Sequence, residues 1–120
     1  MAATFWSPAH RHRVLGFLVL ALGLAEVLRL TTHVAVVEGE SMEPTLHPGE
    51  TCVVSSLLPL RHHDLVVFHH QGELYVKRVM VILPDDSIMV LGDNRAHSTD
   101  SRDFGAVWPY EILGRVIYVH

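Results

Sequence analysis

The segment GESMEPTL, residues 39–46, decides how the chain folds around it. Gly39 stands two residues before Ser41, and Pro44 stands three residues after it. Proline cannot continue a helix, and a glycine lets another backbone or a ligand approach closely. The segment therefore predicts a turn that presents the Ser41 hydroxyl. The same pattern is also typical of an ordinary serine turn that leads into a strand.

Short apolar segments rich in β-branched residues surround this turn and predict strands. The segments HPG (47–49) and PDDS (84–87) indicate turns, HHQG (69–72) a hairpin loop, and residues 92–105 a long polar loop. The predicted strands are residues 34–37, 51–54, 65–68, 73–82, 88–91 and 112–119. Short strands at regular spacing predict a mainly β fold, either a sheet or a partly closed barrel.

An almost uncharged segment, VLGFLVLALGLAEVLRL at residues 14–30, precedes the strands. As a helix it would rise about 25 Å, slightly less than the ~30 Å core of a bilayer. Its charged residues, Glu26 and Arg29, lie three apart and can pair on one helix face. We expect a transmembrane anchor at residues 14–33, between a cytoplasmic tail (1–13) and an extracytoplasmic domain (34–120).

The apolar segment has two other interpretations. Small residues at positions 21–25 are typical of a cleavage site, so the segment could be a signal peptide that is removed. It could also be the core helix of a soluble protein, although no amphipathic pattern supports that. We favour the retained anchor.

Composition argues against several functional classes. A chain of 120 residues with 49% apolar residues is enough for one small domain with a core. The net charge of −4 argues against nucleic acid as a partner. Cys52 is the only cysteine, which excludes an internal disulfide, and its apolar neighbours indicate a small core residue rather than a nucleophile.

The ten histidines raise the question of a metal site. None lies in an HExxH pattern or pairs with cysteines at ligand spacing. The adjacent pairs at 62–63 and 69–70 would point to opposite faces of a strand. We therefore predict histidines of surface loops, and neither a metal nor a cofactor.

Lys77 is the only lysine in the chain, beside eight arginines. Arginine cannot be deprotonated in a protein, whereas a buried lysine can. Apolar residues flank Lys77 on both sides, so we expect poor solvation of its ammonium and a lowered pKa. A neutral lysine can act as the general base for a serine hydroxyl. Chance loss of other lysines from an arginine-rich composition is the alternative.

A third polar segment, GDNRAHSTDSR at residues 92–102, is dense in hydroxyl and charged groups. Such a loop can orient a lysine through a hydroxyl and can brace itself by pairing aspartate with arginine. Alone, it is more typical of an exposed polar loop.

Together these segments resemble the motifs of the signal peptidase I family of membrane-bound Ser/Lys proteases, in the family's order. GESMEPTLHPGE resembles the nucleophile motif, YVKRV the lysine motif and LGDNRAHSTDSRDFG the Gly-Asp-Asn motif. HDLVVF resembles a further motif, with His63 where the family has glycine. The resemblance covers the apolar segment and residues 36–118.

The resemblance implies that Ser41 is the nucleophile and Lys77 the general base. Gly39 stands where some members carry a serine that helps to bind the oxyanion. Backbone N–H groups, including that of Ser41, would therefore form the oxyanion hole. In the Gly-Asp-Asn motif, Ser98 would orient Lys77. The implied structural supports are Asp93 and the Asp100–Arg102 ion pair.

The fold implied by the resemblance is a mostly antiparallel, barrel-like β core that rests on the membrane. Larger members insert a second domain between the lysine and the Gly-Asp-Asn motif, whereas residues 80–91 here hold only a hairpin. The implied substrates are leader peptides of exported proteins, bound as extended strands. Shallow pockets would select small residues at the first and third positions before the cut.

Other functions fit the same residues. Small relatives include dedicated maturation proteases with one client, such as nickel superoxide dismutase. A non-catalytic membrane scaffold is another possibility, but it has no need for Ser41, Lys77 and Ser98 together. A self-cleaving switch like the SOS repressors would need an effector domain, and the sequence shows none.

The flanking charges predict the membrane topology. Two arginines precede the apolar segment and the first acidic residue is Glu26, so the N-terminus should be cytoplasmic. Protease added to spheroplasts should digest the domain at residues 34–120 and spare an N-terminal tag, and the chain should resist a carbonate wash. A protected domain would mean the reverse orientation, and a soluble domain starting near residue 24 would mean a cleaved signal.

Overall fold

The computed structural model describes residues 8–120, which form two units that meet in sequence between Thr31 and Thr32. Residues 1–7 of the expected tail lie outside the described residues. The first unit is helix α1 (Pro8–Thr31), in which Ala9–Thr31 is long and apolar enough to cross a membrane. Residues 32 and 33, included in the expected anchor, belong to a strand instead.

The pairing of Glu26 with Arg29 in α1 is present. The Arg29 guanidinium donates to both carboxylate oxygens of Glu26, at 3.1 and 2.7 Å. The two opposite charges are therefore partly neutralised near the C-terminal end of the helix.

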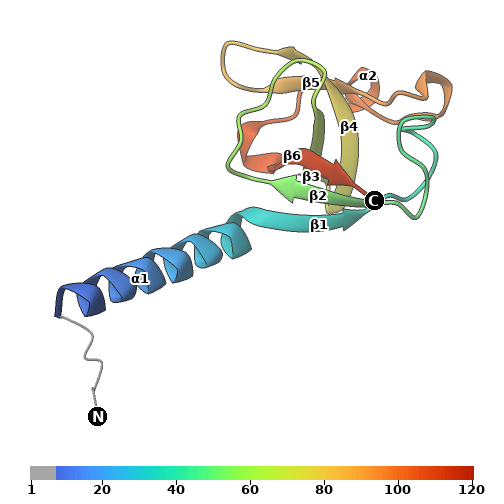
Figure 1. Cartoon of the computed structure of the whole chain (residues 1–120). Helices are drawn as coiled ribbons and strands as arrows, with labels where there is room; N and C mark the ends of the chain where they lie inside the picture. The colour runs from blue at the N-terminus through green and yellow to red at the C-terminus, as the bar shows by residue number, and fades with distance from the viewer. Residues whose placement is uncertain (1–7) are drawn as a thin grey trace. The chain divides into compact units, whose positions relative to one another are not determined.

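The second unit is one six-stranded sheet in the order β1-β2-β6-β3-β4-β5, and every neighbouring pair is antiparallel (Figure 1). The prediction of a mainly β, antiparallel fold with one N-terminal apolar helix is confirmed. The strands are β1 (Thr32–Val36), β2 (Thr51–Ser55), β3 (Leu65–His70), β4 (Glu73–Ile82), β5 (Ile88–Leu91) and β6 (Ile112–Val119). Short helices η1 (Arg95–His97), α2 (Ser101–Phe104) and η2 (Pro109–Glu111) lie between β5 and β6.

The predicted hairpin loop at residues 69–72 is wrong in its length. His69 and His70 belong to β3, and only Gln71 and Gly72 form the turn to β4. Both turn residues have positive φ angles, 49° and 79°, as a tight two-residue hairpin requires. His70 is therefore a half-buried strand residue and not a surface-loop histidine.

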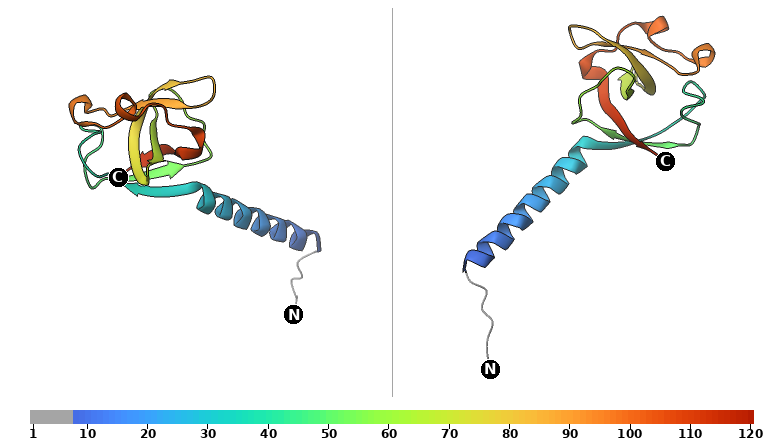
Figure 2. Two further views of the ribbon diagram at one scale, coloured as in Figure 1. Left: turned by 180° about the vertical axis from the view of Figure 1, so that it is seen from behind. Right: turned by 45° about the horizontal axis from the view of Figure 1, so that its top comes forward.

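The outer edge of β1 and the first half of β4 are two of the strand edges that stay unpaired within residues 8–120. β1 is one end of the sheet, and β5 pairs only with the second half of β4, from Arg78 to Ile82. Because each neighbour in the order is antiparallel, β1 and β4 run in the same direction. Irregular pairing in β2, β3 and β4 bends the sheet, which curls on itself in Figure 2.

Two clusters of buried apolar residues form the core, and they draw on opposite faces of β3. One contains Val37, Met42, Leu46, Cys52, Val54 and Val67, and the other contains Val66, Phe68, Val79, Ile88, Val90 and Val107. Cys52 is thus a core residue, as predicted. Met42 and Leu46 come from the turn after β1, and each is only 1% exposed. Their burial, worth about 1.5–3 kcal/mol for each side chain, fixes the segment that carries Ser41.

Candidate active site

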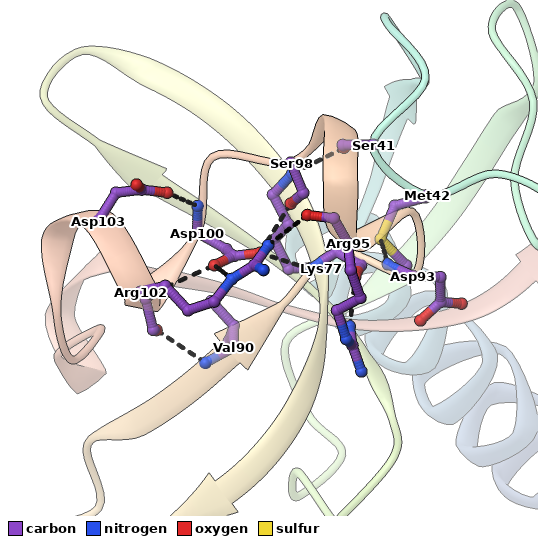
Figure 3. A network of polar contacts seen from close by, with 12 residues as sticks. Ser41, Met42, Lys77, Val90, Asp93, Arg95, Ser98, Asp100, Arg102 and Asp103 are labelled. Carbon is purple, nitrogen blue, oxygen red and sulfur yellow. Dashed lines mark hydrogen bonds and ion pairs between the residues drawn. The ribbon is translucent and has the colours of Figure 1, made fainter.

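Ser41 and Lys77 meet at the end of the unpaired edges. Ser41 lies in the turn after β1, and Lys77 lies in the middle of β4. The Lys77 ammonium Nζ donates a hydrogen bond to Ser41 Oγ at 2.7 Å (Figure 3). Lys77 is only 3% exposed. The two residues that the sequence singled out are therefore in direct contact.

Burial lowers the pKa of Lys77. The negative charge of Asp100 opposes this by raising the pKa, and the positive charge of Arg102 lowers it further. The Tyr75 ring lies 5.8 Å from Nζ. Because a buried ammonium is poorly solvated, the protonation equilibrium shifts toward the neutral amine, which can accept the proton of a hydroxyl.

The Gly-Asp-Asn segment holds the Ser41 turn from outside the core. The Asn94 backbone N–H donates to the Ser41 carbonyl at 2.9 Å, and its side-chain amide donates to the Glu40 carbonyl at 3.1 Å. The Asp93 backbone N–H approaches the Met42 sulfur at 3.4 Å. In Figure 2 the loop after β1 and the loop after β5 lie side by side in both views. The position of the serine is thus set by a segment about fifty residues away in the chain.

Gly92 makes this close approach possible. A Cβ atom at Gly92 would lie 2.6 Å from the Ser41 carbonyl oxygen and 2.1 Å from Ser98 Oγ. Backbone atoms cannot yield easily to such overlap, so no larger residue fits without moving the two loops apart. Gly92 therefore supports the site although it contributes no side chain.

Asp100 is fully buried and organises the rest of this loop. Its carboxylate accepts hydrogen bonds from Ser98 Oγ (2.8 Å), the Gly92 N–H (3.0 Å) and the Arg102 guanidinium (2.9 and 3.0 Å). It also caps α2 by accepting from the Arg102 N–H. Burial would raise the pKa of Asp100, but hydrogen bonds, first that from Arg102, outweigh it and hold the pKa well below its usual range. Asp100 is therefore a permanent negative charge near Lys77.

No hydrogen bond joins Ser98 to Lys77 among the described residues: Ser98 Oγ donates to Asp100 at 2.8 Å, and Lys77 donates to Ser41. Its oxygen keeps lone pairs that can accept a further hydrogen bond. The orienting role of Ser98 stays a prediction.

Asp93 ties three segments together. It accepts two hydrogen bonds from the Arg78 guanidinium, at 2.8 and 2.7 Å, and one from Thr45 Oγ1 at 2.5 Å. Thr45 belongs to the Ser41 turn, and Arg78 follows Lys77 in β4. Hydrogen bonds from Arg78, followed by smaller effects that include the Thr45 bond, lower the pKa of Asp93.

Sequence reasoning missed Arg78, Thr45, Gly92 and Asn94. The sequence did contain a signal for Arg78. Side chains alternate along a strand, so Arg78, next to Lys77, is expected on the opposite face of β4. Arg78 also donates to the His63 carbonyl at 2.7 Å. His63 has a φ of 70°, a conformation that favours glycine. Glycine is the residue that the family motif resembled by HDLVVF has at this position.

A cleft of about 640 Å³ opens beside Ser41 and Lys77. Residues 35–41 form one side and residues 73–77 the other, with Cys52, Val67, His97 and Thr99 completing its lining. The two sides are the unpaired edges of β1 and β4. An extended peptide could therefore add to either edge through backbone hydrogen bonds. The Ser41 amide donates to no backbone acceptor among residues 8–120, so it is free to bind an oxyanion.

Comparison with known proteins gives a consistent set of relatives. A family model described as Peptidase S24-like matches residues 2–117. Signal peptidase I of Bacillus caldolyticus is 31% identical over 136 aligned residues, covering 68% of this chain and 75% of that protein. Mitochondrial inner membrane protease subunit 2 of Saccharomyces cerevisiae is 30% identical over 118, covering 72% and 67%. Signal peptidase I of Bacillus amyloliquefaciens is 35% identical over 81, covering 63% and 43%.

The effect of the neighbouring charges on the pKa of Lys77 can be measured without any substrate. Replacing Arg102 by Gln removes a positive charge near Lys77 and leaves the Asp100 carboxylate without its ion-pair partner. Both changes should raise the pKa of Lys77 toward its ordinary value. Lys77 is the only lysine, so NMR titration of a lysine label in detergent reports one side chain. Arg61→Gln, at an exposed residue, is the matched control. An unchanged or lower pKa in Arg102→Gln would contradict this account.

Proposed function

The chain belongs to the signal peptidase I family and matches the Peptidase S24-like model, and on that basis we propose that it is a membrane-anchored serine endopeptidase that removes leader peptides from exported proteins. The observation that carries the proposal is the 2.7 Å contact between Ser41 Oγ and the buried amine of Lys77. A surface serine turn needs no buried lysine, whereas a nucleophile needs a base within hydrogen-bond reach.

In the proposed reaction the neutral Lys77 amine takes the Ser41 proton as Oγ attacks the scissile carbonyl carbon. The carbonyl oxygen becomes an oxyanion, and the Ser41 N–H donates a hydrogen bond to it, whereas Gly39 has no side chain that could add a second donor. The Lys77 ammonium then gives its proton to the leaving amine, which leaves an ester on Ser41. Lys77 next removes a proton from water, the water attacks the ester, and the peptide acid departs as Ser41 regains its proton.

The neighbouring residues would hold this geometry. Ser98, fixed by its bond to Asp100, would accept a hydrogen bond from Lys77 and keep the amine aimed at Ser41. The Asp100–Arg102 pair would fix the loop that carries Ser98. Asp93 would keep the Ser41 turn and β4 together through Thr45 and Arg78.

The substrate would bind as an extended strand in the cleft between β1 and β4. The cleft is bounded by two unpaired edges that run in the same direction, so backbone hydrogen bonds can form on both sides of the peptide. Helix α1 would span the membrane, with its N-terminal end in the cytoplasm and the sheet on the other side. Leader peptides emerge on that side.

The Ser–Lys pair is tested in cells depleted of this protein and supplied with variants. Ser41→Ala removes the nucleophile, and Lys77→Arg keeps the charge but removes the base, so neither should restore leader removal. N-terminal sequencing of exported proteins is the measurement, and membrane fractionation verifies that each variant is present. Retained leaders on many proteins support general processing, whereas one retained leader supports a dedicated protease. Full processing with Lys77→Arg would contradict the role of Lys77.

Ser98→Ala tests the positioning role separately. Loss of an orienting hydroxyl should lower turnover by a factor on the order of 10–1,000, because a positioning contact can control that much of a rate. Cleavage of a purified leader peptide by the detergent-solubilised variant measures this factor. Turnover equal to that of the unmodified protein would mean that Ser98 is structural only.

A further inference from the structure

A cluster of four aromatic rings stands behind the wall of the cleft. The Tyr75 ring stacks on Phe68 at 5.5 Å and lies 5.9 Å from Phe104 and 6.5 Å from His70. His70 stacks on Phe104 at 4.5 Å. Tyr75 lines the cleft, whereas His70 and Phe104 do not. The position of the Tyr75 ring therefore depends on rings that a substrate does not touch.

One polar contact, between His70 and Glu111, orients the His70 ring within this cluster. His70 Nδ1 lies 3.0 Å from Glu111 Oε1, and both side chains are about 15% exposed or less. The other Glu111 oxygen accepts the Trp108 N–H at 2.8 Å, which holds the carboxylate in place. His70 Nε2 is buried with no partner among the described residues. An unpaired buried nitrogen destabilises the fold, so a phenylalanine would be the simpler ring unless the bond to Glu111 matters.

Tyr75 lies close to the reacting atoms. It stands two residues before Lys77 in β4, on the same face, which places the two Cα atoms about 7 Å apart. Its ring is 5.8 Å from Lys77 Nζ. Among residues 8–120, the Tyr75 hydroxyl makes only a long, exposed hydrogen bond to Glu73, at 3.3 Å. A substrate side chain that packs against Tyr75 must therefore belong to a residue within a few positions of the scissile bond.

We propose that His70, held by Glu111, positions Tyr75 and thereby sets how large a substrate side chain the cleft accepts beside the scissile bond. His70 and Glu111 are positioning residues, because both act through Tyr75. If the His70 ring is removed, the Tyr75 ring can turn into the vacated space and the cleft widens. This inference rests on the proposed function.

The test uses leader peptides in which each residue near the cut is varied among alanine, leucine and phenylalanine. The position at which Tyr75→Ala relaxes the size preference identifies the substrate residue that faces Tyr75. His70→Ala should relax the preference at that same position by about tenfold in kcat/KM, the scale on which pockets distinguish side-chain size. The peptide with the small side chain should keep its kcat. The double variant should show less than the sum of the two effects, because both act on one ring.

Three further variants make the result decisive. His69→Ala is the matched control, since His69 is the adjacent exposed residue of β3, and its selectivity should not change. His70→Phe keeps a ring without the bond to Glu111, and Glu111→Gln alters that bond while keeping the ring. Both should relax selectivity at the position that faces Tyr75. Thermal unfolding shows which variants are folded, so the assays compare folded proteins.

Unchanged selectivity in folded His70→Phe and Glu111→Gln would overturn the proposal. So would an equal loss of kcat/KM on all peptides, which indicates general damage, or a changed preference at another position. A failure of the unmodified protein to cleave any of the peptides would instead count against the proposed function.

Discussion

Burying the only lysine of the chain is energetically unfavourable, because an ammonium loses its hydration when it leaves water. The structure offsets this with a hydrogen bond to Ser41 and with the negative charge of Asp100 nearby. Asp100 is itself buried, so it needs the donors of Ser98, Gly92 and Arg102. Burial of the Lys77 amine thus depends on Asp100, and burial of Asp100 depends in turn on its hydrogen-bond donors. The same burial that is unfavourable for folding lowers the pKa of that amine, as the proposed role of Lys77 as a base requires.

The site is assembled from segments that are distant in sequence, and short-range packing holds them together. The Ser41 turn is anchored in the core through Met42 and Leu46. Asn94 joins this turn to the loop after β5. Asp93 joins it to β4, because the carboxylate accepts hydrogen bonds from Thr45 of the turn and from Arg78 of β4. The close contact at Gly92 leaves no room between the two loops. These contacts restrict how far the Ser41 turn can move from Lys77, as the proposed pairing of a nucleophile with its base requires.

The sequence predicted the strands well because β-branched segments and turn residues alternate clearly along the chain. It also identified Ser41 and Lys77, which are in contact, from the glycine and proline around one and the rarity of the other. It failed for His70, because the turn at Gln71 and Gly72 needs unusual φ angles and the partner Glu111 lies far along the chain. The bounds of α1 also differ from those of the expected anchor, since apolar composition indicates a stretch that could cross a membrane and does not mark the ends of a helix.

The alternation of Lys77 and Arg78 along β4 has a consequence for how the protein can misfold. Lys77 faces Ser41, and Arg78 faces Asp93 on the other side of the strand. Because side chains alternate along a strand, a shift of β4 by one residue would exchange the two cations. Most backbone bonds of the sheet could form again after such a shift, but Ser41 would then face a guanidinium that never loses its proton. A misaligned molecule would resemble the native one in its content of secondary structure and differ from it in the chemistry at Ser41.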